Sequence, residues 1–161
     1  MTKYESGVKK IYAPVANVYA KLSDLTNLGI VQQRMADPAF EQVIRQQAGD
    51  KVSDEQLARL REIVEGMKFD RDWVVVNVAP LGEVGLRVEE REEPKLVKFT
   101  SENSPVEAKL WIQLLPAGDS QCAMKVTLGA DLNFFLKQML KGKLQDGVDR
   151  LADMLAMIGY S

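Results

Sequence analysis

From residue 69 onward, hydrophobic residues recur at every second position, which is the period of a β-strand with one buried face. Between residues 106 and 114, for example, Val106, Ala108 and Leu110 alternate with Glu107 and Lys109. The same alternation marks residues 74–78, 84–88, 97–100 and 122–130. Short connections (PLG, EEP, NSP and PAGDS) join these segments. The pattern therefore predicts consecutive antiparallel hairpins with one apolar and one wet face.

The end of the chain changes to a helical period. Asn133 is a good N-cap, and a single apolar arc follows it. The arc contains Leu136, Leu140, Leu144, Val148, Leu151, Met154, Leu155 and Ile158. We expect one long helix over residues 133–158 that lies on the apolar face of the sheet. Gly147 falls inside the arc and Gly142 opposite it, so Gly147 either allows close backbone approach or leaves a gap.

The pattern in the first part of the chain predicts a strand followed by helices. The strand covers about residues 3–12, and Ala13-Pro14 opens a helix over the next eight or so residues. A short helical turn, SDLTNLG, should end at Gly29. Two more helices are expected over residues 37–48, where Asp37-Pro38 is the start signal, and 53–66, where SDEQ matches a capping box. These two helices act either as peripheral packing or as a lid.

Composition narrows the class of protein. The chain has 161 residues, 46% of them hydrophobic, and a net charge of −2, which fits one soluble domain. The near-neutral charge provides no basic surface for nucleic acid, and no apolar run is long enough for stable membrane insertion. Cys122 is the single cysteine, so no intrachain disulfide forms. We therefore expect a cytoplasmic protein.

The chain contains no histidine. The usual zinc sites and the serine or cysteine nucleophiles that depend on histidine are therefore excluded. The phosphate-binding motifs GxGxxG and GxxxxGK[ST] and the nucleophile motif GxSxG do not occur either. We expect no metal, no cofactor and no catalytic residue of these common kinds.

Several local motifs together resemble a known superfamily. They are Glu5-Ser6 with Val8, IYAP at residues 11–14, LSDLTNL at 22–28, LWIQLLP at 110–116, and the final amphipathic helix. This arrangement resembles the START-like helix-grip superfamily, also called SRPBCC, as a small member of the bacterial, polyketide cyclase or lipid-transport-like type. The resemblance implies an α+β fold, with a curved antiparallel sheet of about six strands wrapped around the C-terminal helix. It covers residues 1–161 as one domain, and a helical insertion at about 33–66 departs from it.

The resemblance also implies a hydrophobic small-molecule ligand, lipid-like or polyketide-like, in an apolar cavity between the sheet and the terminal helix. The residues that would line this cavity are those on the inward-facing positions of the strands and on the apolar arc of the helix, although such positions are more often simply core. These residues are Val76, Val88, Val97, Phe99, Leu110, Met124, Val126, Leu140, Leu144, Gly147 and Leu151. We favour non-enzymatic binding or transport of such a ligand.

Two alternatives stay open at this point. One is a cyclase or dehydratase that uses Ser101, Glu90 or Tyr12 for proton transfer, although a change of strand register should leave Glu90 in water. Cys122 shares the parity of the apolar positions of its strand, which favours an inert buried thiol. The other alternative is an interaction domain that contacts a protein partner or a second copy through an exposed apolar stripe on the inserted helices. That stripe would contain Phe40, Val43, Ile44, Leu57, Leu60 and Val64.

Overall fold

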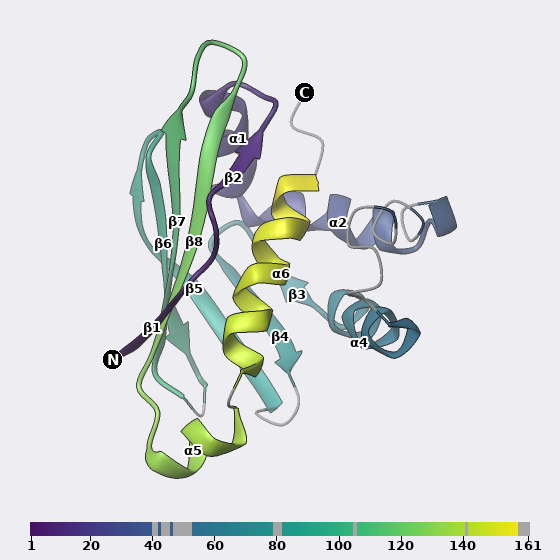
Figure 1. Ribbon diagram of the computed structural model, residues 1–161, viewed down its shortest axis with the longest axis vertical. Helices are drawn as coiled ribbons and strands as arrows, with labels where there is room; N and C mark the ends of the chain where they lie inside the picture. The colour runs from purple at the N-terminus through teal and green to yellow at the C-terminus, as the bar shows by residue number, and fades with distance from the viewer. Residues whose placement is uncertain are drawn as a thin grey trace.

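A curved antiparallel sheet forms the body of the protein in the computed structural model (Figure 1), which describes residues 1–39, 42, 46, 53–78, 82–104, 106–140 and 142–157. Within these residues the sheet has eight strands. They are β1 (Thr2–Glu5), β2 (Lys9–Ile11), β3 (Lys68–Phe69), β4 (Trp73–Val78), β5 (Gly82–Glu92), β6 (Leu96–Glu102), β7 (Ala108–Pro116) and β8 (Cys122–Ala130). Their order is β1-β8-β7-β6-β5-β4-β3, and β2 also pairs with β8. The α+β architecture predicted from the sequence is confirmed.

The strand register places the expected apolar positions on one face. Val76 pairs with Val84, and Val88, Phe99 and Leu110 follow one another across β5, β6 and β7. A register shift between Val88 and Glu90 interrupts the β5–β6 ladder, and Glu90 is exposed. The predicted change of register at Glu90 is thus confirmed, and it keeps a carboxylate out of the apolar face.

The strand expected over residues 3–12 is divided in two at Ser6. The Ser6 hydroxyl accepts a hydrogen bond from the Val126 N–H at 3.0 Å, while the Ser6 N–H donates to the Val126 carbonyl at 2.8 Å. Ser6 therefore takes part in the pairing with β8 through its side chain and lets the chain bend between β1 and β2. This division, together with the short strand β3, raises the number of strands above the six expected.

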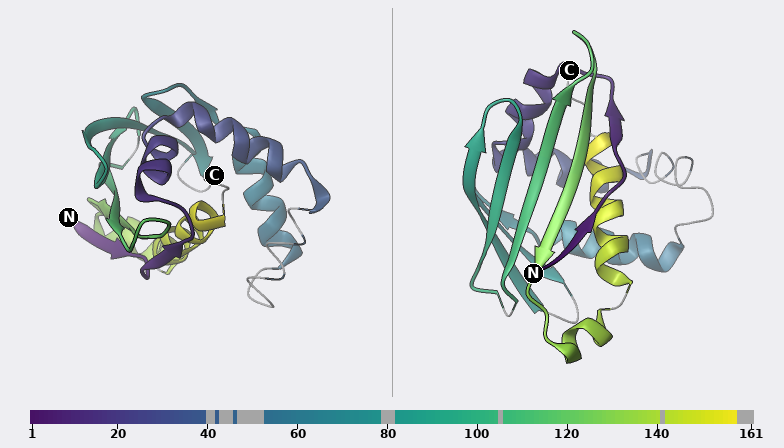
Figure 2. Two further views of the ribbon diagram at one scale, coloured as in Figure 1. Left: turned by 90° about the horizontal axis from the view of Figure 1, so that it is seen from above. Right: turned by 60° about the vertical axis from the view of Figure 1, so that its left-hand side comes forward.

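Helices lie on the inner side of the sheet, beside it and at one of its ends (Figure 2). They are α1 (Val15–Leu22), the 3-10 helix η1 (Leu25–Asn27), α2 (Leu28–Met35), α4 (Asp54–Glu65), α5 (Phe134–Met139) and α6 (Lys143–Met157). Both views of Figure 2 place α2 and α4 on the side of the molecule away from β6 and β7. No helix in the described ranges has the length and apolar character needed to cross a bilayer.

The prediction of a single long helix over residues 133–158 is wrong, because the helix is interrupted between α5 and α6. Gly142 has a φ of +77°, a left-handed conformation that side chains disfavour, so it cannot continue a helix. The predicted start is confirmed: the Asn133 side chain accepts a hydrogen bond from the Leu136 N–H at 2.8 Å. Gly142 therefore divides the segment into a short helix and a long one.

The helical turn predicted to stop at Gly29 instead continues as α2 to Met35. A Cβ atom at Gly29 would lie 3.7 Å from the Phe69 ring, so this glycine lies where α2 passes close to β3. Val31 is 2% exposed and anchors α2 in the interior, which outweighs the low helix propensity of glycine. Tertiary packing therefore lets the helix continue through a glycine, a residue that often ends a helix.

The second inserted helix is confirmed as α4, and the Gln32 side chain of α2 forms hydrogen bonds to the backbone where α4 ends. The Gln32 Nε2 donates to the carbonyls of Val64 and Met67, both at 3.0 Å. In the first inserted segment, the Asp37 carboxylate accepts a hydrogen bond from the Ala39 N–H at 2.9 Å, as an N-cap does. Most of residues 40–48 lie outside the described residues, so the helix expected over 37–48 stays a prediction.

Candidate functional site

One half of the inner sheet face is closely covered. The helix α6 packs chiefly against β8, β1 and β2, and α1 packs against β7. Below them Val97, Met124 and Val126 are at most 1% exposed. We call the inward residues of β6, β7 and β8 the closed half. They are Val97, Phe99, Leu110, Ile112, Leu114, Cys122, Met124 and Val126.

The other half of the same face is less well covered. Val76 on β4 and Leu86 and Val88 on β5 point inward by register, yet each remains only half-buried, whereas Val74 on β4 is buried. We call Val76, Val84, Leu86 and Val88 the open half. Half-buried Leu28, Met67 and Phe69, from α2 and the region of β3, pack against the same main core as Val76, Leu86 and Val88. The open half is therefore an apolar surface that the described helices do not fully bury.

Two polar contacts join α6 to β1 and β2. The Gln145 Nε2 donates to the Glu5 carbonyl of β1 at 2.8 Å, and the Lys9 Nζ of β2 lies 2.7 Å from the Asp153 carboxylate. At 100° per residue, Gly147 and Met154 lie about half a turn away from Gln145 and about a third of a turn away from Asp153. They form the flank of α6 away from β1, together with half-buried Leu144 and Leu151. Leu151 also packs against the main core.

The sequence-predicted lining residues separate into three groups. Val97, Phe99, Leu110, Met124 and Val126 are at most 7% exposed and belong to the closed half. Val76, Val88, Leu144 and Leu151 are half-buried, on the open half and on α6. Leu140 is buried at the end of α5.

Gly147 is exposed rather than enclosed, and a Cβ atom there would meet nothing within 4 Å. The close backbone approach considered for Gly147 is therefore wrong, because no neighbouring element lies against its Cα. Gly147 instead leaves the outer part of this flank of α6 without a side chain. Its role in ligand binding stays a prediction.

The polar groups considered for catalysis do not converge on the interior. The hydroxyl of Ser101 accepts a hydrogen bond from the Ala108 N–H at 2.9 Å, Tyr12 is 77% exposed, and Glu90 is exposed. Cys122 is fully buried, and burial raises the pKa of its thiol, which favours the inert form. Burial, helped by the nearby Glu93 carboxylate, also raises the pKa of Tyr19. These groups provide no acid–base pair on the apolar face.

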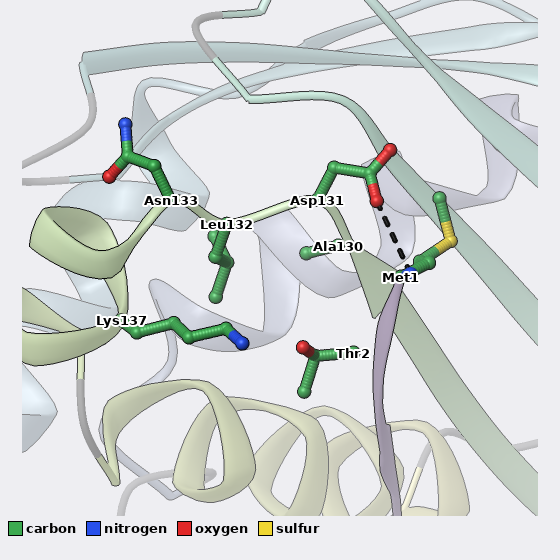
Figure 3. Close-up of a pocket in the computed structure, with 7 residues that line it drawn as sticks. All are labelled: Met1, Thr2, Ala130, Asp131, Leu132, Asn133 and Lys137. Carbon is green, nitrogen blue, oxygen red and sulfur yellow. Dashed lines mark ion pairs between the residues drawn. The ribbon is translucent and has the colours of Figure 1, made fainter.

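Two members of the apolar stripe expected for an interaction domain, Leu57 and Val64, are each 3% exposed and therefore buried on α4. The other members, Phe40, Val43, Ile44 and the side chain of Leu60, lie outside the described residues. Two surface hollows lie elsewhere. One of about 320 Å³ lies between the start of β1 and α5, lined by Met1, Thr2, Ala130, Asp131, Leu132, Asn133 and Lys137 (Figure 3). The other, of about 270 Å³, lies on β4 and β5 beside the Arg87–Glu102 ion pair. Neither hollow is lined by a residue of α6.

Sequence reasoning did not select three half-buried residues that pack against the main core: Leu28, Met67 and Phe69. Leu28 and Met67 lie on either side of the inserted segment, and Phe69 ends a strand of two residues, which is too short for a clear alternation. It also did not single out Phe134 and Phe135, which are 79% and 70% exposed on α5. Two adjacent phenylalanines at a helix start, outside the apolar arc, were the available signal.

Comparisons with known proteins support the fold. The sequence matches no protein-family model, and no curated protein matches it. Norcoclaurine synthase from Thalictrum flavum, in complex with dopamine and hydroxybenzaldehyde, is similar with a TM-score of 0.65 at 10% identity, over 96% of this chain and 84% of that one. A START superfamily protein from Mycobacterium smegmatis is similar with a TM-score of 0.60 at 12% identity, over 96% and 94%. A conserved protein from Geobacillus kaustophilus gives 0.57 at 15% identity, over 96% and 93%.

These likenesses define the class of architecture, a helix-grip fold with a curved antiparallel sheet and a helix across it. More particularly, the chain has the fold of the START-like superfamily, as its sequence resemblance predicted. At 10 to 15% identity the likeness extends to the fold alone. The function must therefore be argued from the residues of this chain.

Proposed function

We propose that this protein binds an apolar small molecule between the open half of the sheet and α6, without chemistry of its own. The observation that carries this proposal is the half-buried state of Val76, Leu86 and Val88 on the inner face. Valine and leucine are among the residues most often fully buried, so a group of inward-facing ones that stay half-buried is a candidate ligand surface. A bound apolar molecule would remove their remaining surface from water, at about 25 cal/mol per Å² before the costs of association.

The shape of α6 supports the same position for the ligand. Its flank away from β1 carries Leu144, Leu151 and Met154, and Gly147 adds no side chain between them. Methionine adapts to irregular ligand shapes because its side chain is unbranched and flexible. A ligand held there would contact apolar groups on both sides, so we expect loose specificity for lipid-like or polyketide-like molecules and modest affinity.

The polar groups of the chain favour binding over catalysis. General acid–base catalysis needs a titratable group aimed at the ligand, and Glu90 and Tyr12 are both exposed to water. The structure of the plant synthase, which has a similar fold, contains dopamine and hydroxybenzaldehyde, so this fold accommodates small aromatic molecules in at least one case. That relative is named as an enzyme, and the same fold serves different functions.

The test fills the flank of α6. Gly147→Leu adds an apolar side chain where a Cβ atom meets no neighbour, so the fold should tolerate it. We expect the variant to lower the affinity for a fluorescent hydrophobic probe, such as anilinonaphthalene sulfonate, by about tenfold, the effect of roughly 1.4 kcal/mol of lost contact. Probe titration followed by displacement with fatty acids of different lengths would measure this loss.

The matched control is Ala58→Leu, which enlarges an apolar side chain at an exposed position of α4 without changing the charge. It should leave probe affinity unchanged. The proposal fails if wild-type protein shows no saturable probe binding, or if both variants behave alike. Thermal melting of each variant would separate a binding effect from loss of the fold.

A further inference from the structure

The short helix α5 has hydrophobic side chains on two sides, separated by exposed Lys137 and Gln138. On the inner side, half-buried Leu136 packs on a small cluster formed by Val106, Ala108 and Ala130. The outer side carries Phe134 and Phe135, which are 79% and 70% exposed. Large adjacent apolar side chains left exposed on a helix that is anchored on its other side mark a candidate interaction surface.

The two phenylalanines are held in position rather than carried on a frayed end. Asn133 caps the start of α5 through the 2.8 Å hydrogen bond from the Leu136 N–H, and Leu136 anchors the inner side. The left-handed Gly142 then turns the chain into α6. Both ends of α5 are thus defined, and the helix lies at one end of the molecule, beyond the start of α6 (Figure 1).

The charge around α5 differs in sign from that of the whole chain. Residues 132–145 contain three lysines and no acidic residue, whereas the protein has a net charge of −2. Lys137 and Lys143 are exposed, and Lys137 extends from α5 along the hollow toward Thr2 (Figure 3). Two carboxylates lie close in sequence: Asp131, which is 3.5 Å from the Met1 amino group, and Asp146 in the first turn of α6. The segment that carries the phenylalanines is thus basic, and the exposed carboxylates of Asp131, Asp146 and Glu107, next to Asp131, border it.

We propose that α5 docks on the surface of an anionic lipid bilayer. Phe134 and Phe135 would enter the boundary between head groups and acyl chains, and Lys137 and Lys143 would contact acidic head groups. Aromatic residues and lysines on one short helical segment match the chemistry of that boundary, because apolar burial and attraction to anionic lipids add together. A protein partner would need an acidic and apolar groove, whereas the bilayer offers both features on a flat surface. This docking does not depend on the proposed interior ligand.

The experiment measures binding of the full chain to vesicles by flotation. Vesicles of phosphatidylcholine mixed with phosphatidylglycerol should bind the protein, and vesicles of phosphatidylcholine alone should bind it less. The double variant Phe134→Ser/Phe135→Ser should lose about tenfold or more in partition to the anionic vesicles. Lys137→Gln/Lys143→Gln should lose about fivefold per lysine at low salt and little at high salt.

The matched control is Val8→Ser/Leu115→Ser, which removes two apolar side chains that are 70% and 68% exposed and lie away from α5. This control should bind vesicles as the wild type does. The proposal is overturned if wild-type protein does not float with anionic vesicles, or if the control variant loses as much binding as the phenylalanine variant. It is also overturned if the phenylalanine variant changes only the oligomeric state in sedimentation velocity, which would make α5 a contact between copies.

Discussion

The closed and open halves of the sheet share one apolar pattern but differ in how they are covered. Val97 on β6 is fully buried, whereas Val88 on the neighbouring β5 is half-buried, although both point to the same face. The difference lies above the sheet, where α6 packs against β1, β2 and β8 at one edge and α2 and α4 lie toward the other. The same strand pattern can therefore build a core or an apolar surface, and the position of the helices decides which.

The largest difference between the halves should appear when methionine is truncated. Met124→Ala removes a side chain that is 1% exposed in the closed half, so it should lower the free energy of unfolding by about 2–5 kcal/mol. Met154→Ala removes the same kind of side chain from the flank of α6 away from β1, where it is half-buried, and should lower the free energy of unfolding by about 1 kcal/mol. Urea unfolding of both variants would measure the pair, and equal losses would contradict the division into two halves.

A smaller effect of opposite sign is expected at the two glycines of the terminal segment. Gly147→Ala should raise the free energy of unfolding by up to about 1 kcal/mol, since alanine favours the helix and its Cβ atom meets no neighbour. Gly142→Ala should lower it by about 1 kcal/mol, because alanine disfavours a φ of +77°. Thermal melting would compare them. A lower free energy of unfolding for Gly147→Ala would mean that the flank of α6 away from β1 already contacts another part of the chain.

The smallest effect concerns the contact that holds α6 toward β2. The Lys9–Asp153 ion pair joins side chains that are 31% and 57% exposed, so its coupling energy should be below about 1 kcal/mol. A double-mutant cycle with Lys9→Ala and Asp153→Ala would measure this coupling by urea unfolding. A coupling well above that value would show that polar contacts, rather than the closed apolar core, fix the position of α6.

Much of the fold could be predicted because it depends on local patterns. The alternation in residues 106–114 and 122–130 predicted β7 and β8, and the SDEQ capping box predicted α4. The break at Gly142 was missed because the apolar arc continues across it, and an arc reports side-chain direction but not the backbone angle at one residue. The prediction that a helix ends at Gly29 was wrong because burial of Val31 stabilises α2 beyond that glycine, and this tertiary contact is not visible in the local sequence.

The candidate site was less predictable than the fold. Val88 and Val97 have the same parity and chemistry, so nothing in the sequence distinguishes the half-buried residue from the core residue. That distinction depends on which strands α6 contacts, and this contact joins residues that lie far apart along the chain, such as Gln145 with Glu5 and Lys9 with Asp153. Long-range polar pairs of this kind leave no periodic signal.

The amide of Gln32 has a consequence for how the α2–α4 side of the molecule could open. It donates to the carbonyls of Val64, in the last turn of α4, and of Met67, two residues beyond that helix, and the Val64 carbonyl also accepts a hydrogen bond from the Met67 N–H at 3.3 Å. Fraying of that end would therefore also release the side chain of α2 that is bonded to it. The two helices should then lose hydrogen-exchange protection together, as one cooperative unit, while the strands of the closed half keep theirs. Access from that side would be governed by the rate of a sub-global unfolding step shared by two helices.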